Sequence, residues 1–225
     1  MAKRIVHGEF LALDYILEKY KEKTTYEKEL YYKLLEQMQI SENINQLMSI
    51  EGRMRKYYYT FFDQIIKNEI FRFEKRSKRP PLNEINATIS FGNAIIYSEV
   101  LNSINQTKLD PRIGYLHTSN DRTNTLSLDI AEIFKPILID DLIIELFSNR
   151  KFYKTDFENK NKGIYLNTEG REKYLFKIDE KLKQTKINKQ EHKVMSNRVI
   201  IKREVQKIQS HIMGIKKYVP YQEVI

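Results

Sequence analysis

Apolar residues recur at helical spacing along most of this chain, and this pattern restricts the fold more than any other feature of the sequence. Residues 4–22 and residues 25–39 each place their apolar side chains on one stripe, which predicts two amphipathic helices. A third stretch, residues 42–66, continues the pattern after Ser41, a residue type that often caps helix N-termini. The sequence therefore predicts an all-α, multi-helix domain.

Proline divides the next part of the chain. Residues 77–81 contain two prolines and predict a connection, because proline stops helix propagation. A helix is expected over residues 83–104, where Gly92 indicates close packing against another backbone. A strongly apolar helix is expected over residues 126–148, and Pro136 should kink or divide it.

The C-terminal part has a less regular pattern. Residues 152–163 resemble a loop, and residues 164–166 predict one short strand or hairpin in the otherwise all-α chain. Two further helices are expected, over residues 168–183 and about 189–215.

Composition excludes several kinds of site. The 225 residues include no cysteine, which excludes disulfides, thiolate zinc sites and cysteine nucleophiles and is compatible with a reducing, cytoplasmic setting. No signal peptide is visible, and the apolar runs are too short or too interrupted to span a bilayer. We therefore expect a cytoplasmic protein with no membrane partner.

The positive charge is concentrated in one region. Residues 150–217 contain 19 Lys and Arg against 8 Asp and Glu, whereas the rest of the chain is slightly acidic. Such a region favours a polyanion through counterion release, although a solvated Lys-rich surface explains it equally well. We expect one domain over residues 1–225, with an acidic metal-site core at about 42–148 and a basic region at about 150–217.

Two carboxylates interrupt the apolar helix after Leu126. Asp129 and Glu132 are three residues apart, so they share a helix face, and apolar residues surround them. A divalent ion between them would remove their repulsion, and Mg²⁺ or Mn²⁺ prefers carboxylate oxygens, with imidazole shifting the preference towards Mn²⁺. The alternative is a solvated helix face, which is more common.

Other candidate residues carry weaker signals when taken alone. An isolated histidine such as His117 is more often structural than catalytic, and Glu51 alone is weaker still. Arg53 and Arg55, next to a run of three tyrosines, could line a DNA channel, although helical aromatics are more often part of the core. The polar stretch 118–125 is a candidate mobile loop beside the site.

Four local motifs occur in an order that resembles the CRISPR-associated family of spacer-acquisition integrases and endonucleases. They are Ile50-Glu51-Gly52-Arg53, residues 79–83 with the Ser-Phe-Gly helix at 86–99, Leu109-Asp110-Pro111 with Gly114-Tyr115-Leu116-His117, and residues 127–136. The resemblance covers almost the whole chain. It implies a helical catalytic domain, with the family's N-terminal β-rich domain expected to be absent from this sequence.

The resemblance also implies a site and its partners. Glu51, His117 and Glu132 correspond to ligands of Mg²⁺ or Mn²⁺, and Asp129 to a neighbouring catalytic acid that supports them. Glu132 stands where some members have aspartate, so the ligand reaches further with the same charge. The implied partners are double-stranded and branched DNA, including protospacer and repeat, and a small ferredoxin-fold adaptation protein, with homodimers in full-length members.

The resulting hypothesis is a metal-dependent DNA endonuclease and integrase of CRISPR adaptation that inserts DNA 3′-hydroxyl ends by transesterification. Two alternatives stay open, a non-enzymatic helical DNA-binding module and a catalytic-domain fragment that is inactive without its dimerising domain. We expect a set of basic residues to contact DNA, namely Arg53, Arg55, Lys193, Arg198, Lys202 and Arg203.

Overall fold

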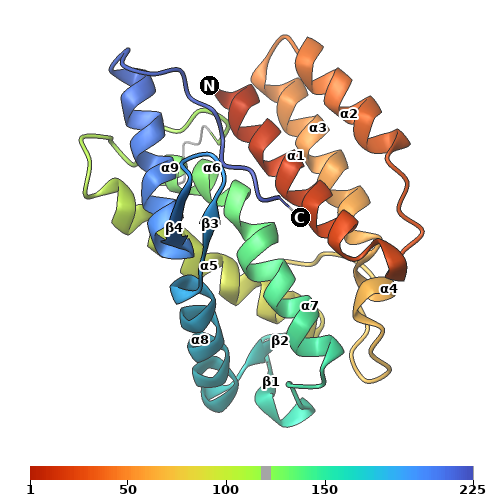
Figure 1. Ribbon diagram of the computed structural model, residues 1–225. Coiled ribbons are helices and arrows are strands. Elements are labelled where there is room, and N and C mark those ends of the chain that lie inside the picture. The colour runs from red at the N-terminus through yellow and green to blue at the C-terminus, as the bar shows by residue number, and fades with distance from the viewer. Residues whose placement is uncertain (118–122, 225) are drawn as a thin grey trace.

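Helices dominate the computed structural model, which describes residues 1–117 and 123–224 (Figure 1). The first half contains α1 (Ala2–Lys19), η1 (Lys21–Lys23), α2 (Glu29–Ile40), α3 (Ile44–Tyr59), α4 (Phe62–Ile66) and α5 (Glu84–Ile104). The second half contains α6 (Thr125–Phe134), η2 (Lys135–Asp140), α7 (Asp141–Ser148), η3 (Lys154–Asp156), α8 (Thr168–Lys183) and α9 (Asn197–Ile212). Two antiparallel hairpins complete the described part: β1 (Phe157–Lys160) with β2 (Gly163–Leu166), and β3 (Thr185–Asn188) with β4 (Lys193–Ser196). The fold is therefore mainly helical, as predicted, but not all-α.

The predicted helix over residues 42–66 is wrong at its start and near its end. Asn43, not Ser41, is the N-cap, because its side chain accepts a hydrogen bond from the backbone N–H of Gln46 at 3.0 Å. The Ser41 hydroxyl donates instead to the Met38 carbonyl and closes the preceding helix. The helical run is interrupted after Tyr59, and α4 follows as a separate short helix.

Pro136 divides the apolar helix as predicted. The run continues from α6 to α7 through η2, a π-helical segment. Proline lacks the N–H that an α-helix needs at this position, so a locally wider turn is a natural outcome. Gly92 on α5 faces this run, and an added Cβ would lie 2.6 Å from the Tyr174 hydroxyl and 2.8 Å from Ile139. The close packing predicted at Gly92 is thus against side chains rather than backbone.

The C-terminal third corrects two further expectations. The predicted strand at 164–166 is present in β2, but its partner β1 lies in the segment expected to be a loop. The predicted last helix begins too early, because residues 185–196 form the hairpin β3–β4 and α9 starts only after Ser196. The Ser196 hydroxyl accepts from the backbone N–H of Val199, which fixes this start.

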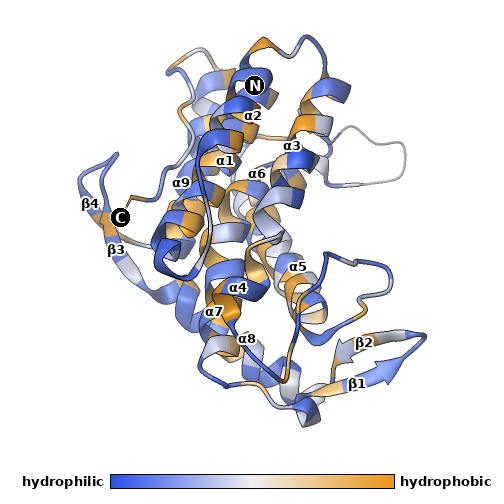
Figure 2. Cartoon of the chain, turned by 90° about the vertical axis from the view of Figure 1, so that its right-hand side faces the viewer, coloured by the Kyte–Doolittle hydropathy of each residue, from blue (hydrophilic) through white to orange (hydrophobic). Residues whose placement is uncertain are grey.

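The core forms where α1 packs against α3 and α6, and α6 packs against α5. Figure 2 shows hydrophobic residues mainly where helices face one another, and hydrophilic residues outside. The C-terminal tail then runs back along α1, where Pro220 contacts Gly8 so closely that an added Cβ would lie 2.6 Å away. No helix in the described ranges is both long and apolar enough to cross a membrane.

Asp140, at the end of η2, is a buried carboxylate within this core. Its side chain lies near Tyr58, and one of its oxygens has no hydrogen-bond partner among the described residues. Burial raises the pKa of Asp140 to about 7, although Arg55 and Arg76 oppose the shift. The ionised form is therefore disfavoured in the folded protein.

Asp140→Asn is expected to remove a pH-dependent loss of stability. Below about pH 4 both the folded and unfolded states hold the proton, so the variant and wild type should be equally stable. Between about pH 4 and 7 only the unfolded wild type loses it, so wild-type stability should fall relative to the variant, by up to about 4 kcal/mol. Urea unfolding at pH 4, 6 and 8 measures the difference, and a constant difference would contradict this account.

Candidate metal centre

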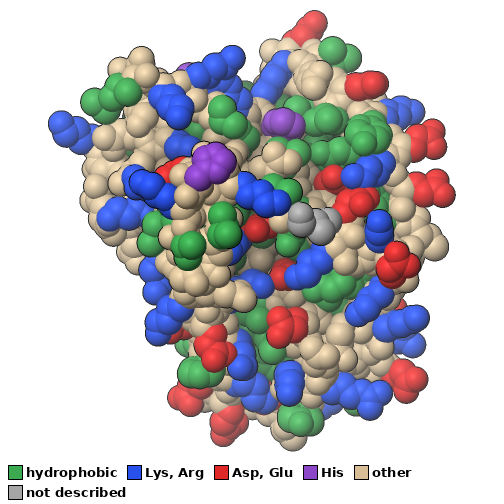
Figure 3. Space-filling view, viewed as in Figure 1, with side chains coloured by type: hydrophobic (Ala, Val, Ile, Leu, Met, Phe, Trp, Pro, Cys, Tyr) green, Lys and Arg blue, Asp and Glu red, His purple; other side chains and the backbone are tan. Residues whose placement is uncertain are grey.

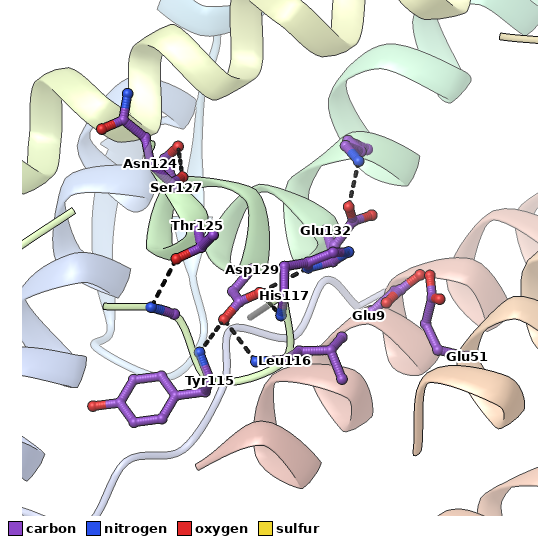
Figure 4. Close-up of polar contacts among 12 residues, drawn as sticks. Glu9, Glu51, Tyr115, Leu116, His117, Asn124, Thr125, Ser127, Asp129 and Glu132 are labelled. Carbon is purple, nitrogen blue, oxygen red and sulfur yellow. Dashed lines mark hydrogen bonds and ion pairs between the residues drawn. The ribbon is translucent and has the colours of Figure 1, made fainter. Parts of the chain in front are cut away.

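Three helices bring three carboxylates together. Glu9 on α1, Glu51 on α3 and Glu132 on α6 each contribute an oxygen, and these oxygens lie within 4.8 Å of one another. Glu9 is fully buried and Glu132 is 4% exposed. Figure 4 shows the side chains of Glu9 and Glu51 facing each other. The sequence predicted that Glu51 and Glu132 would meet, but it gave no role to Glu9.

Two cations neutralise this cluster of Glu9, Glu51 and Glu132, which we call the carboxylate cluster. The Arg55 Nε lies 2.6 Å from Glu9 and 2.5 Å from Glu51, and its Nη2 pairs with Glu132. Lys135 lies 2.5 Å from the other oxygen of Glu132. Arg55, predicted to contact DNA, therefore faces the carboxylate cluster.

Burial changes the acidity of the enclosed groups. It raises the pKa of Glu9 to about 8, with the Arg55 charge opposing the change. It lowers the pKa of Lys135 to about 8, and the nearby Arg55 charge adds to that shift. Each group resists ionisation in this setting, which indicates a poorly solvated site.

Asp129 holds the histidine segment in place. Its fully buried carboxylate accepts hydrogen bonds from the backbone N–H groups of Tyr115, Leu116 and His117, at 2.5, 2.9 and 3.0 Å. It also lies 2.8 Å from Nδ1 of the His117 ring (Figure 4). A carboxylate accepts hydrogen bonds, so this contact favours a proton on Nδ1 and leaves the Nε2 lone pair for another partner.

His117 itself lies outside the group of oxygens that meet within 4.8 Å, where Glu9 is the third member. Its role as a metal ligand stays a prediction, supported by the way Asp129 orients its ring. Of the candidate mobile loop at 118–125, residues 118–122 lie outside the described residues. Thr125, at its end, accepts from the Gly114 N–H and donates to the Arg112 carbonyl.

The carboxylate cluster fits a hard divalent ion. Carboxylate oxygens are the donors that Mg²⁺ and Mn²⁺ prefer, and three lying this close together can share one ion. Within the described part of the chain, both oxygens of Glu9 and one oxygen of Glu132 are buried without a hydrogen bond, and their compensation comes from the nearby charge of Arg55. Such atoms are costly unless a cation compensates them.

The sequence did contain a signal for Glu9. It lies four residues after Ile5 and four before Leu13, on the apolar stripe of α1, where a charge is out of place. Lys135 gave a similar signal, since it stands inside the apolar run before Pro136 and is 3% exposed. Glu9 was missed because it lies outside the motifs that carry the family resemblance, whereas Lys135 was given no role although it lies within the last of them, residues 127–136.

The other predicted DNA-binding residues lie at the surface. Arg53 is exposed and contacts Gln37. Arg198 pairs with Glu99 and Asp179, and Arg203 lies 3.5 Å from Glu191, so both share their charge with neighbouring carboxylates.

Lys193 on β4 and Lys202 on α9 are exposed and, in residues 1–117 and 123–224, have no ion-pair partner. Figure 3 shows Lys and Arg spread over one face with acidic side chains between them.

Apart from these exposed residues, a groove of about 590 Å³ is lined in part by basic side chains. It is lined by Lys78, Arg79, Phe91, Tyr165 and Arg171, together with Pro80 and Pro81 and neighbouring residues. Burial, followed by the charges of Arg55 and Lys135, lowers the pKa of Lys78 to about 8, which indicates that the groove lies near the carboxylate cluster. Cations next to aromatic rings are typical of surfaces that bind nucleic-acid strands.

Comparisons with known proteins extend these observations. The family model described as CRISPR associated protein Cas1 matches residues 1–180. The chain is 48% identical over 177 residues to CRISPR-associated endonuclease Cas1 2 of Thermodesulfovibrio yellowstonii and 42% identical over 174 residues to CRISPR-associated endonuclease Cas1 of Thermotoga maritima. These matches cover 79% and 77% of the chain but 54% of each relative, so the chain spans about half their length.

Solved structures agree with the family match. A Cas1 protein from Thermotoga maritima superposes with a TM-score of 0.88 at 36% identity, over 96% of this chain and 66% of the other. A casposase bound to integration product superposes with a TM-score of 0.89 at 19% identity, over 99% of this chain and 66% of the other, and shares the fold. Structures of a Cas6-RT-Cas1–Cas2 complex also match, with a TM-score of 0.85 at 19% identity. Since the family model covers most of the chain, the resemblance read from its motifs is confirmed and the chain belongs to the Cas1 family of CRISPR-associated proteins.

Proposed function

We propose that this chain carries the catalytic centre of a metal-dependent DNA endonuclease and integrase of CRISPR adaptation. The observation that carries the proposal is the meeting of Glu9, Glu51 and Glu132 from three separate helices. A helical DNA-binding module needs no such convergence of buried carboxylates. The names of the relatives, endonucleases and an integration complex, support the same class of chemistry.

The proposed site residues have two roles: some hold the ion, and Asp129 orients one of those ligands. Glu51, Glu132 and His117 would hold Mg²⁺ or Mn²⁺, which, when bound, polarises a phosphate oxygen and stabilises the charge that develops at phosphorus. Asp129 fixes the tautomer and direction of the His117 ring. The side chains of Glu51 and Glu132 are only 14% and 6% exposed, so an ion that they hold would be partly shielded from bulk solvent.

The reaction exchanges one phosphodiester bond for another. A DNA 3′-hydroxyl attacks the phosphorus of a strand in the repeat, a new P–O bond forms, and the old bond releases a 3′-hydroxyl. The number of phosphodiester bonds is unchanged, so no covalent enzyme intermediate and no energy source are needed. The reverse reaction, or attack by water, cuts branched DNA at the same centre.

DNA binding is assigned to the basic surfaces. Lys193 and Lys202 have exposed side chains that can contact phosphates without losing an existing ion pair. The groove beside Lys78 suits a single strand that approaches the carboxylate cluster. The proposed assembly partners are a small ferredoxin-fold adaptation protein and a second copy of the chain, the latter by analogy with the homodimers expected of full-length family members; the match to chains in Cas6-RT-Cas1–Cas2 complexes supports the first.

Purified protein is expected to convert a branched DNA substrate to cleaved and joined products with Mn²⁺, and to lose this activity in a chelator. Gel analysis of end-labelled strands measures both outcomes, and electrophoretic shift measures binding. DNA binding without product under every metal condition would contradict an active centre in this chain. Activity that returns only after fusion to a β-rich dimerising domain would instead support the inactive-fragment alternative.

A further inference from the structure

Arg55 occupies the position where a metal ion would be expected. Its guanidinium reaches all three members of the carboxylate cluster, which come from α1, α3 and α6. Its side chain is 16% exposed, and that of Glu9 is not exposed at all. No other cation among the described residues pairs with all three of these carboxylates.

A guanidinium and a divalent ion make competing demands on these oxygens. A divalent ion held by these oxygens would compete with the Arg55 guanidinium, which already lies 2.6 Å from Glu9 and 2.5 Å from Glu51. The two cations would then repel each other at short range in a poorly solvated site. Both cannot be held by the same three oxygens at once.

Glu9 is the most deeply buried of the three carboxylates. Its two oxygens are buried and make no hydrogen bond in residues 1–117 and 123–224, so the Arg55 charge is what compensates them, and Glu9 faces Glu51 across the cluster (Figure 4). Its placement is firm, because the C-terminal tail packs against the preceding Gly8. A fixed carboxylate of this kind is well suited to a cation and poorly suited to a solvated surface.

We infer that Glu9 is a third carboxylate of the ion site and that Arg55 is its resident counter-charge, which leaves when the divalent ion binds. This inference rests on the proposed function, since it concerns the same ion. The displaced guanidinium is then free to pair with a DNA phosphate. Arg55 thus stabilises the ion-free protein and contacts DNA only after exchange.

The exchange is tested by measuring Mn²⁺ affinity directly, by titration calorimetry and by the EPR signal of free Mn²⁺. Arg55→Gln removes the competing charge and should bind Mn²⁺ about 10-fold more tightly than wild type. Its melting temperature without metal should fall, and Mn²⁺ should raise it by more than in wild type. Arg53→Gln is the matched control, because it makes the same substitution on the same helix at an exposed position.

Glu9→Gln tests the other half of the inference. It keeps the size of the side chain and should weaken Mn²⁺ binding by about 10- to 100-fold, with unchanged helical content. Glu18→Gln, also on α1 but paired with Lys28, should bind Mn²⁺ like wild type. Wild-type affinity in Glu9→Gln, or equal affinities in Arg55→Gln and Arg53→Gln, would overturn the inference.

Glu132→Gln separates this failure from failure of the proposed function. If wild type binds Mn²⁺ and Glu132→Gln does not, the proposed ion site is supported. In that case wild-type Mn²⁺ affinity in Glu9→Gln and Arg55→Gln would reject only the exchange. If wild type itself binds no Mn²⁺, with or without branched DNA, the proposed ion site fails and the exchange fails with it.

Discussion

Glu132→Gln is expected to reduce Mn²⁺-dependent cleavage and joining of branched DNA by at least about 100-fold while the protein stays folded. The substitution keeps the side-chain shape but removes the charge of Glu132, which is 4% exposed and lies beside Glu9 and Glu51. Loss of that charge weakens ion binding, because Mg²⁺ and Mn²⁺ prefer ionised carboxylate oxygens. Initial rates on labelled branched DNA, with circular dichroism of the same samples, measure the effect.

The same loss is expected for Glu51→Ala and His117→Ala. Glu145→Gln is the control for Glu132→Gln, since Glu145 lies on α7 with an exposed side chain and should keep wild-type rates. Each variant should still bind DNA, because the basic surfaces are untouched. Wild-type rates in any one purified variant would remove that residue from the site.

The carboxylates on α3 and α6 were predictable, and their third partner was not. Glu51 and Glu132 stand in short motifs, so the order of those motifs was enough to predict that they share a site. Glu9 belongs to no motif, and it meets them only because α1 packs between α3 and α6. Periodicity predicts that a helix exists, but not which neighbours surround one position on its buried face.

Arg55 was read from sequence as a DNA contact because it lies beside Arg53 in a basic, aromatic segment. Two residues along a helix point in different directions, so Arg53 faces solvent while Arg55 faces the carboxylate cluster. The hairpin β3–β4 was missed for a related reason. Its strands are only four residues long, so their local sequence pattern is too weak to predict them. Their packing against α9, which the sequence does not reveal, stabilises them.

Asp129→Ala should combine a large loss of stability with a large loss of activity. The carboxylate accepts three backbone hydrogen bonds from residues 115–117, and its removal leaves those donors without partners. We expect a loss of roughly 2–5 kcal/mol in unfolding free energy. Ser127→Ala, which removes one buried hydroxyl from the same helix, should cost only about 1 kcal/mol. Urea unfolding measures both.

A purely structural role for Asp129 would not change the protonation of His117. Asp129→Asn keeps the size of the side chain and one accepting oxygen, so it should remain folded at moderate cost, but it removes the charge that favours a proton on Nδ1. The ring nitrogen shifts of His117 in ¹⁵N NMR should then move away from the Nδ1–H tautomer, and Mn²⁺ affinity should fall by about 10- to 100-fold. Affinity should fall because a ring held in the other tautomer presents an N–H, and not a lone pair, to the ion. Wild-type nitrogen shifts and wild-type affinity in the folded variant would therefore show that Asp129 supports the backbone alone.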